Sequence, residues 1–154
     1  RFGNTHVVRS SAVRTGRVTP ATPDGRLAGT PLAGSVAASV GAERSGPTAL
    51  LNSVAKLNAA RSWQTGYQVN LRFQGAMLSN PANREKVRAL LNVYFRKGGQ
   101  QLQINAIDTE ILRAAQKNPE AYRDLVVRIA GFSEFFVNLS PDMQEDLIAR
   151  TAHM

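Results

Sequence analysis

Near the C-terminal end of the chain, one glycine separates two apolar runs of different composition. The first run, Leu125 to Ala130, is rich in β-branched residues, the second, Phe132 to Val137, is rich in aromatic residues, and Gly131 stands between them. Glycine inside an extended apolar segment costs stability, so it usually marks a bend or a close approach of another group to the backbone. Gly131 is therefore either a tight, buried turn or a position that another group must reach.

Side chains that commonly perform catalysis or bind metals are scarce. The chain contains no cysteine, which excludes disulfides and thiolate metal sites within it. Its two histidines, His6 and His153, lie near opposite ends and lack metal-ligand spacing. We interpret both histidines as surface residues and expect no metal site.

The residues around the glycine form a specific pattern. From position 126 to position 132 they read aliphatic, aliphatic, arginine, aliphatic, small, glycine, aromatic. This pattern resembles the signature of the glycyl radical enzymes, in which the glycine stores an unpaired electron on its α-carbon. The resemblance implies that Gly131 is the radical residue. Four neighbours would support the radical loop: Arg128, Ala130, Phe132 and Ser133.

The resemblance continues, in the same order, along nearly the whole chain. Gly98 to Asn105 resembles the glycine-pair strand that precedes the radical site, and Asn118 to Arg128 resembles the segment that leads into the loop. Leu139 to Met154 is similar to the C-terminal helix of the family. Pro23 to Ala33 and Gly46 to Leu57 look like upstream segments of the dehydratase and decarboxylase branch, rather than of pyruvate formate-lyase.

The family implies an α/β fold, and this chain would be the C-terminal part of a ten-stranded α/β barrel. In that barrel a finger loop with the glycine meets a second loop with a cysteine. Residues 1–75 would be partial barrel scaffold and loops, and residues 76–154 would be the glycyl radical domain. Because the chain begins with Arg1 and lacks the catalytic cysteine, we expect it to be a piece of a longer polypeptide.

The resemblance also implies a partner and a cofactor. A separate radical S-adenosylmethionine activating enzyme, which holds an iron–sulfur cluster, would remove a hydrogen atom from Gly131. The glycyl radical would then generate a thiyl radical, which takes hydrogen from a small organic substrate. A glycine α-radical can become planar and delocalise over both adjoining amides, whereas a β-carbon would crowd that geometry. The expected setting is oxygen-sensitive anaerobic metabolism, in a homo-oligomer of the full enzyme.

The neighbours of the glycine leave alternatives open. Ile129, Phe132, Phe135 and Phe136 suit a dry enclosure that keeps water and oxygen away. Arg128 either bonds carbonyls, pairs with a carboxylate, or is a partly exposed charge that alternates with a buried valine.

Two positions after the glycine depart from the family pattern. Glu134 stands where a small residue is expected, and it would contact substrate, pair with Arg128, or face outward. Phe132 replaces the commoner tyrosine and so removes a hydroxyl group.

Three classes of function follow from the sequence. The favoured one is the C-terminal portion of a lyase-type glycyl radical enzyme, with dehydration, decarboxylation, carbon–nitrogen or carbon–sulfur cleavage, or addition to fumarate as candidate reactions. The second is a small autonomous glycyl radical replacement subunit, which the scaffold-like residues 1–75 argue against. The third is a basic nucleic-acid-binding module, which rests only on the net charge of +8, from 19 Lys and Arg against 11 Asp and Glu.

Composition argues against nucleic-acid and membrane partners. The basic residues are scattered, and no zinc-finger spacing or RNA-binding aromatic signature appears. No apolar run is long enough to span a bilayer, and no segment resembles a secretion signal. We therefore expect a cytoplasmic protein with no nucleic-acid partner.

Hydrophobic periodicity predicts the elements that must position the glycine. Residues 1–47 are either a disordered linker or long ordered loops on a larger scaffold, and short apolar stretches such as Val36 to Val40 favour ordered loops. They include a turn at Pro23-Asp24-Gly25. Ser45, Asp108 and Ser140 are the expected helix caps. We expect helices over residues 47–60, 79–96, 109–117 and from 141 onward, and one-face-buried strands over residues 67–73 and 101–106.

Overall fold

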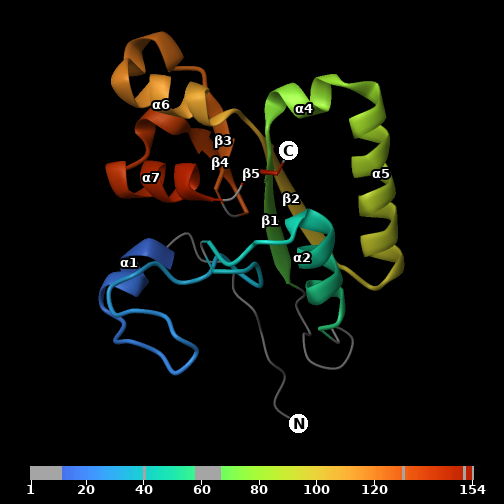
Figure 1. Ribbon diagram of the computed structural model, residues 1–154. Coiled ribbons are helices and arrows are strands. Elements are labelled where there is room, and N and C mark those ends of the chain that lie inside the picture. Colours follow the sequence, from blue (N-terminus) through green and yellow to red (C-terminus); the bar gives the residue numbers. More distant parts are fainter. Residues whose placement is uncertain (1–11, 40, 58–66, 130, 151, 154) are drawn as a thin grey trace.

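The computed structural model describes residues 12–39, 41–57, 67–129 and 131–150, with the backbone of Ala152 and His153. Helices and strands are mixed along the chain, which confirms the predicted α/β class (Figure 1). The elements are α1 (Ala12–Arg17), α2 (Gly46–Ala55), β1 (Gln68–Phe73), α4 (Gly75–Ser79), α5 (Pro81–Arg96), β2 (Gln101–Ala106), α6 (Thr109–Lys117), η1 (Pro119–Tyr122), β3 (Val126–Arg128), β4 (Ser133–Phe135), η2 (Phe136–Asn138), α7 (Pro141–Ala149) and β5 (Ala152–His153).

A parallel three-stranded sheet with the order β2-β1-β5 lies in the middle of the molecule. Figure 1 shows α4 and α5 on one side of it, and α6, α7 and the β3–β4 hairpin on the other. In the pairing of β1 with β2, Gln68 is level with Gln101, and Arg72 is level with Asn105. Polar residues of the two strands therefore share one face of the sheet, because side chains alternate between the faces.

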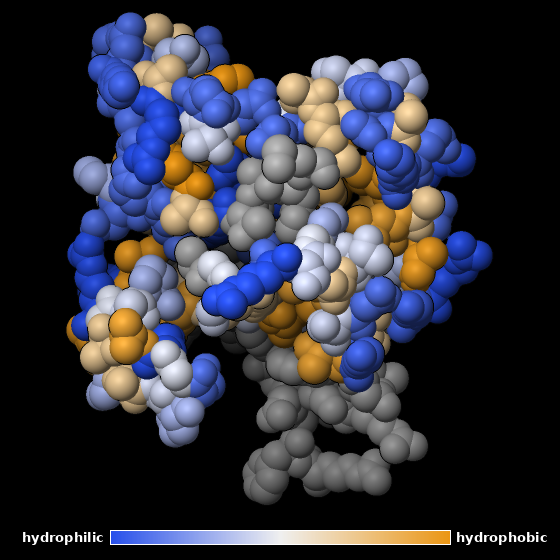
Figure 2. Space-filling view, viewed as in Figure 1, coloured by the Kyte–Doolittle hydropathy of each residue, from blue (hydrophilic) through white to orange (hydrophobic). Residues whose placement is uncertain are grey.

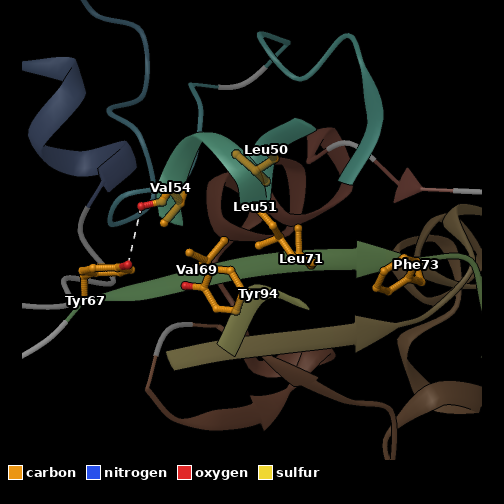
Figure 3. Close-up of a cluster of buried hydrophobic side chains, with 8 residues drawn as sticks. All are labelled: Leu50, Leu51, Val54, Tyr67, Val69, Leu71, Phe73 and Tyr94. Carbon is orange, nitrogen blue, oxygen red and sulfur yellow. Dashed lines mark hydrogen bonds between the residues drawn. The ribbon is translucent and has the colours of Figure 1, made fainter. Parts of the chain in front are cut away.

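The opposite, apolar face packs on helices. Val69 and Leu71 of β1 lie beside α2 and Tyr94 of α5, and the Tyr67 hydroxyl donates to the Val54 carbonyl at 3.5 Å (Figure 3). Phe73 belongs to the same cluster and lies at the C-terminal end of β1. Leu102 and Ile104 of β2 pack against the same cluster. A second cluster fills the space between α6, α7 and the hairpin: Leu112, Ala115, Val127, Ile129, Phe136, Leu139, Leu147 and Ile148.

The prediction that only one face of β1 is buried is wrong. On the polar face Gln68 is 1% exposed and Arg72 is 3% exposed. The strand alternates as predicted, but the C-terminal half of the chain covers its polar side. Alternation alone does not distinguish a solvent-facing side from a buried polar one.

The helix expected over residues 79–96 is α5, which begins two positions later, at Pro81, and ends at Arg96 as predicted. The short helix α4, which ends at Ser79, was not predicted. Asn80 has extended backbone angles, as steric clash with the proline ring requires of a residue before Pro81. Its side-chain oxygen accepts from the Ala82 N–H at 2.9 Å and caps α5. Gly98, at φ +89, ends α5 as predicted, and a Cβ at Gly99 would lie 2.4 Å from the ring of Tyr94.

The three predicted caps occupy the N-cap positions of their helices, but none makes a side-chain cap hydrogen bond. The carboxylate of Asp108 accepts from the Gly75 N–H at 2.7 Å instead. Asp108 therefore accepts from a backbone N–H that is distant in sequence rather than from one in the first turn of α6. This bond connects the residues after β1 to the start of α6. Helix α2 ends at Ala55, earlier than expected, and residues 58–60 lie outside the described parts.

Ordered loops precede α2, as predicted, although α1 was not expected. The Pro23-Asp24-Gly25 turn is confirmed, with Gly25 at φ +94 and its N–H donating to the Thr22 carbonyl at 3.0 Å. The Arg26 guanidinium gathers the loop by donating to the carbonyls of Thr30 at 2.6 Å and Thr19 at 3.1 Å.

The surface is mixed, and Figure 2 shows apolar groups reaching it in several places among hydrophilic ones. The large apolar side chains that are exposed include Val93 and Phe95 on α5, and Val126, Phe132 and Phe135 around the hairpin. No helix in the described parts is both long enough and apolar enough to cross a membrane.

Arg72 joins the polar face of the sheet to the C-terminal end of α7. Its guanidinium donates to the carbonyls of Leu147 at 3.3 Å, Ile148 at 2.8 Å and Arg150 at 3.1 Å, and to the Thr109 hydroxyl. The last carbonyls of a helix lack partners within it and form the negative end of its dipole. Arg72 therefore satisfies the end of α7 from the sheet.

The charge of Arg72 persists despite its burial. Burial lowers the pKa of the guanidinium, and the carboxylates of Glu110 and Asp108 oppose that change. Arginine remains protonated in proteins because its ordinary pKa lies far above neutral pH.

We predict that Arg72→Met lowers the free energy of unfolding by about 3 kcal/mol, because buried carbonyls at the end of α7 lose their donors. The matched control is Arg88→Met. Arg88 pairs with Glu85 on the surface, where its side chain is 72% exposed, so its loss should cost less than about 0.5 kcal/mol. Urea unfolding followed by circular dichroism measures both, and equal midpoints would contradict the prediction.

Candidate functional site

Gly131 lies in the loop that joins β3 to β4. The two strands are antiparallel, with Arg128 opposite Ser133, and the Ile129 N–H donates to the Phe132 carbonyl at 3.0 Å. The two apolar runs of the sequence thus fold back on one another as a hairpin. Gly131 has φ +77, in the left-handed region that favours glycine.

The glycine is exposed in this chain, so no part of the described residues buries the turn. A Cβ built at Gly131 would have no heavy atom within 4 Å, its chain neighbours aside. Among the described residues the glycine is therefore required by its backbone angle rather than by a close neighbour. The space beside its α-carbon is open to another group.

Two amide side chains of β2 hold the hairpin by its backbone. Asn105 Oδ1 accepts from the Arg128 N–H at 2.8 Å, and Asn105 Nδ2 donates to the Arg128 carbonyl at 2.7 Å. Gln103 Oε1 accepts from the Gly131 N–H at 3.2 Å. Both side chains are buried, at 7% exposure for Gln103 and 8% for Asn105.

A third side chain, Arg150, holds the hairpin just before the glycine. Its guanidinium donates to the Ile129 carbonyl at 3.2 Å and to the Asp146 carboxylate at 3.0 Å. The α7 end that Arg72 anchors therefore supports the hairpin in turn.

The functional residues predicted from the sequence did not include Gln103, Asn105 or Arg150. Gln103 and Asn105 are two positions apart, so the sequence already indicated that both side chains lie on the same face of the predicted strand. That face was interpreted as solvent-exposed.

The predicted supporting residues have different outcomes. Arg128 is half-buried, and its guanidinium donates only a 3.3 Å bond to the Ser133 hydroxyl, so it fits the partly exposed interpretation. Ser133 is exposed. Glu134 accepts from the Phe135 N–H at 2.8 Å and from Asn138 Nδ2 at 3.2 Å rather than from Arg128. Ala130 lies outside the described residues.

The dry enclosure is only half present. Ile129 and Phe136 are buried at 4% and 0% exposure, whereas Phe132 and Phe135 are 43% and 42% exposed. A hairpin buries one face against its own core. No element in the described parts covers the other two aromatic rings.

A groove of about 570 Å³ separates β2 from the hairpin. Residues 101–107 line one wall, and Val126, Val127, Arg128 and Ser133 line the other. Gln103 and Asn105 bridge the groove to reach the hairpin. Across the described residues, no group of three or more histidine, cysteine, aspartate or glutamate side chains could hold a metal ion.

Comparison with known families identifies the fold of the hairpin region. The model of the family described as "Glycine radical" matches residues 32–137, which is more than half of the chain and includes β1, β2 and the hairpin. The chain belongs to the glycine radical family. Gly131 and both amide residues of β2 lie inside the matched segment.

Individual relatives match over almost the whole chain. It is 45% identical over 146 residues to the probable dehydratase YbiW of Escherichia coli, which covers 94% of the chain and 18% of that protein. It is 42% identical over 149 residues to the isethionate sulfite-lyase of Oleidesulfovibrio alaskensis, which covers 96% of the chain and 18% of that protein.

A solved structure also matches this chain over almost its whole length. The B12-independent glycerol dehydratase of Clostridium butyricum, in its glycerol-bound form, superposes with a TM-score of 0.92 at 43% identity. The match covers 99% of this chain and 19% of the dehydratase. The chain thus spans about a fifth of the length of these relatives of the glycine radical family.

We predict that Asn105→Leu loosens the hairpin. The substitution keeps the branched shape of the side chain but removes both partners of the Arg128 backbone, at a cost of about 2 kcal/mol or more in the free energy of unfolding. Gln101→Leu is the matched control, since Gln101 lies on the same face of β2 but is exposed. Hydrogen exchange of a peptide spanning residues 126–137 should rise in Asn105→Leu alone, and equal exchange in the two variants would refute the prediction.

Proposed function

We propose that this chain is the C-terminal, radical-bearing portion of a lyase-type glycyl radical enzyme and that Gly131 stores the radical. One observation carries the proposal: Gly131 lies within the matched segment, at the bend of a hairpin, with an open α-carbon and a restrained amide. The surrounding geometry suits a residue whose backbone takes part in the reaction.

Storage begins with the loss of one hydrogen atom from the α-carbon of Gly131. A separate activating enzyme would supply the hydrogen acceptor, a radical that it would generate from S-adenosylmethionine with one electron from its iron–sulfur cluster. The remaining unpaired electron delocalises over the two adjoining amides. Glycine suits this role because no β-carbon hinders a planar α-carbon.

During catalysis, hydrogen atoms move from the substrate by way of a cysteine to Gly131, and then back along the same route. The Gly131 radical takes a hydrogen atom from the thiol of a cysteine outside this chain, and the resulting thiyl radical takes one from a small organic substrate. After the substrate radical loses a group, the thiol returns a hydrogen atom to it. The thiyl radical then takes a hydrogen atom back from Gly131, so no atom or electron is gained or lost over the cycle.

The rest of the enzyme would complete the fold. In this proposal the β2-β1-β5 sheet is part of a ten-stranded barrel, with residues 1–75 as scaffold and residues 76–154 as the glycyl radical domain. The hairpin is then the finger loop. The exposed side chains of Val126, Phe132 and Phe135 would be covered by the parts of the barrel beyond this chain, which would exclude water and oxygen.

The names of the relatives favour lyase chemistry on small molecules. A probable dehydratase, a sulfite-lyase and a glycerol dehydratase each match over 94% or more of this chain. Matches of that extent favour a portion of a large enzyme over an autonomous replacement subunit. We place the whole enzyme in the cytoplasm as a homo-oligomer.

Electron paramagnetic resonance of the full-length enzyme tests the radical site. After anaerobic incubation with the reduced activating enzyme and S-adenosylmethionine, we predict a doublet near the free-electron position. Gly131→Ala should abolish it. The matched control is Gly29→Ala, because Gly29 has nearly the same backbone angle, φ +76, and equally open surroundings.

The control separates two causes of a lost signal. Alanine in the left-handed region costs about 1 kcal/mol at either site, so both variants carry similar strain. Only Gly131→Ala should lose the doublet. Absence of a signal from the folded parent enzyme, with an activating enzyme that works on its own partner, would refute the proposed function.

A further inference from the structure

The hairpin is held across the groove by side chains of β2, and all three of these bonds go to hairpin backbone. Asn105 supplies two of them, to the N–H and the carbonyl of Arg128. Gln103 supplies the third, to the N–H of Gly131 itself. The contact with the glycine is thus a side-chain bond to one of the two amides that would share its radical.

The orientation of the Gln103 amide follows from this bond. A backbone N–H can only donate, so the oxygen of Gln103 must face Gly131, and the nitrogen must face away. That nitrogen, Gln103 Nε2, is buried and has no hydrogen-bond partner among the described residues. Gln103 therefore holds the Gly131 amide at the cost of an unsatisfied donor.

Stability alone does not favour glutamine at this position. A buried amide with an unsatisfied donor is destabilising relative to an apolar side chain of similar size. Leu102 and Ile104, on the opposite face of β2, pack against the first apolar cluster, whereas Gln103 lies on the face that lines the groove. Where a protein leaves a buried polar group without a hydrogen-bond partner, a functional requirement is the usual reason.

We propose that Gln103 is a positioning residue for the radical step, and that it fixes the plane of the Gly131 amide. This inference rests on the proposed function of Gly131. Delocalisation requires the α-carbon to be coplanar with both adjoining amides, so Gly131 must turn away from φ +77 when its hydrogen atom leaves. A bond accepted from the N–H holds the plane of that amide in place while the α-carbon flattens against it. The same bond leaves the lone pair of the nitrogen more available to the electron-poor α-carbon. Asn105 fixes the strand from which the loop emerges, so the restraint acts on a loop that is already docked.

Two substitutions in the full-length enzyme isolate the acceptor oxygen. Gln103→Met keeps the length of the side chain and removes the acceptor. Gln103→Glu keeps an acceptor oxygen in either protonation state but removes the Nε2 donor. The control is Gln101→Leu, because Gln101 lies on the same strand and the same face, is exposed, and makes no bond to the described part of the hairpin.

The readouts are the decay rate of the doublet under argon and the nitrogen coupling in enzyme labelled with ¹⁵N-glycine. Loss of one neutral hydrogen bond changes an equilibrium by about fivefold. We expect the radical of Gln103→Met to decay about fivefold faster, with an altered nitrogen coupling. Gln103→Glu and Gln101→Leu should resemble the parent enzyme, and thermal midpoints should show that every variant is folded.

Two results would overturn the inference: a Gln103→Met radical that matches Gln101→Leu in decay and coupling, or a Gln103→Glu radical that matches Gln103→Met. A merely structural role would lower the thermal midpoint without changing the nitrogen coupling. The failure of the proposed function is a different result, since the parent enzyme would then show no doublet.

Discussion

The arrangement of this chain depends on one constraint, the burial of a polar sheet face. Gln68 and Arg72 of β1 and Gln103 and Asn105 of β2 all lie on that face with less than a tenth of their surface exposed. Buried polar groups must find partners, and here several partners are backbone groups of the C-terminal half. Arg72 donates hydrogen bonds to carbonyls at the end of α7, and the side-chain amides of Gln103 and Asn105 bind backbone groups of the hairpin. The two hydrophobic clusters are thereby joined by hydrogen bonds rather than by a common apolar core.

This constraint also explains how the hairpin is placed. Apolar packing is non-directional, and it fixes only one side of the hairpin, through Val127 and Ile129. Hydrogen bonds are directional, and those of Asn105 to both backbone groups of Arg128 set the height of β3 along β2. Because the bonds go to backbone, they specify where the loop lies while leaving its side chains free for other contacts.

The sequence allowed the local elements to be predicted, because their signals are local. Helix α6 spans residues 109–117 and strand β2 spans residues 101–106, both as predicted. Helix α5 begins at Pro81, two positions later than predicted, and the short helix α4 before it was not predicted. The bond between Asp108 and the Gly75 N–H and the burial of the polar face of β2 could not be predicted in the same way, since the partners are distant in sequence. Gly75 is 33 positions from Asp108, and Gly131 is 28 positions from Gln103. The same alternation of polar and apolar residues is expected whether the polar face of a strand contacts water or another part of the chain.

Two glycines show how differently the same residue can be required. At Gly99 the ring of Tyr94 occupies the place of a Cβ, so packing within the chain excludes any larger residue. At Gly131 no described residue occupies that place, and the requirement lies in the backbone angle and in access to the α-carbon. An exposed α-radical would meet water and oxygen. On the proposed function, the cover must therefore come from outside this chain, and the exposed rings of Phe132 and Phe135 mark the surface that it would bury. The chain thus holds and orients the glycine, while its protection depends on the remainder of the enzyme.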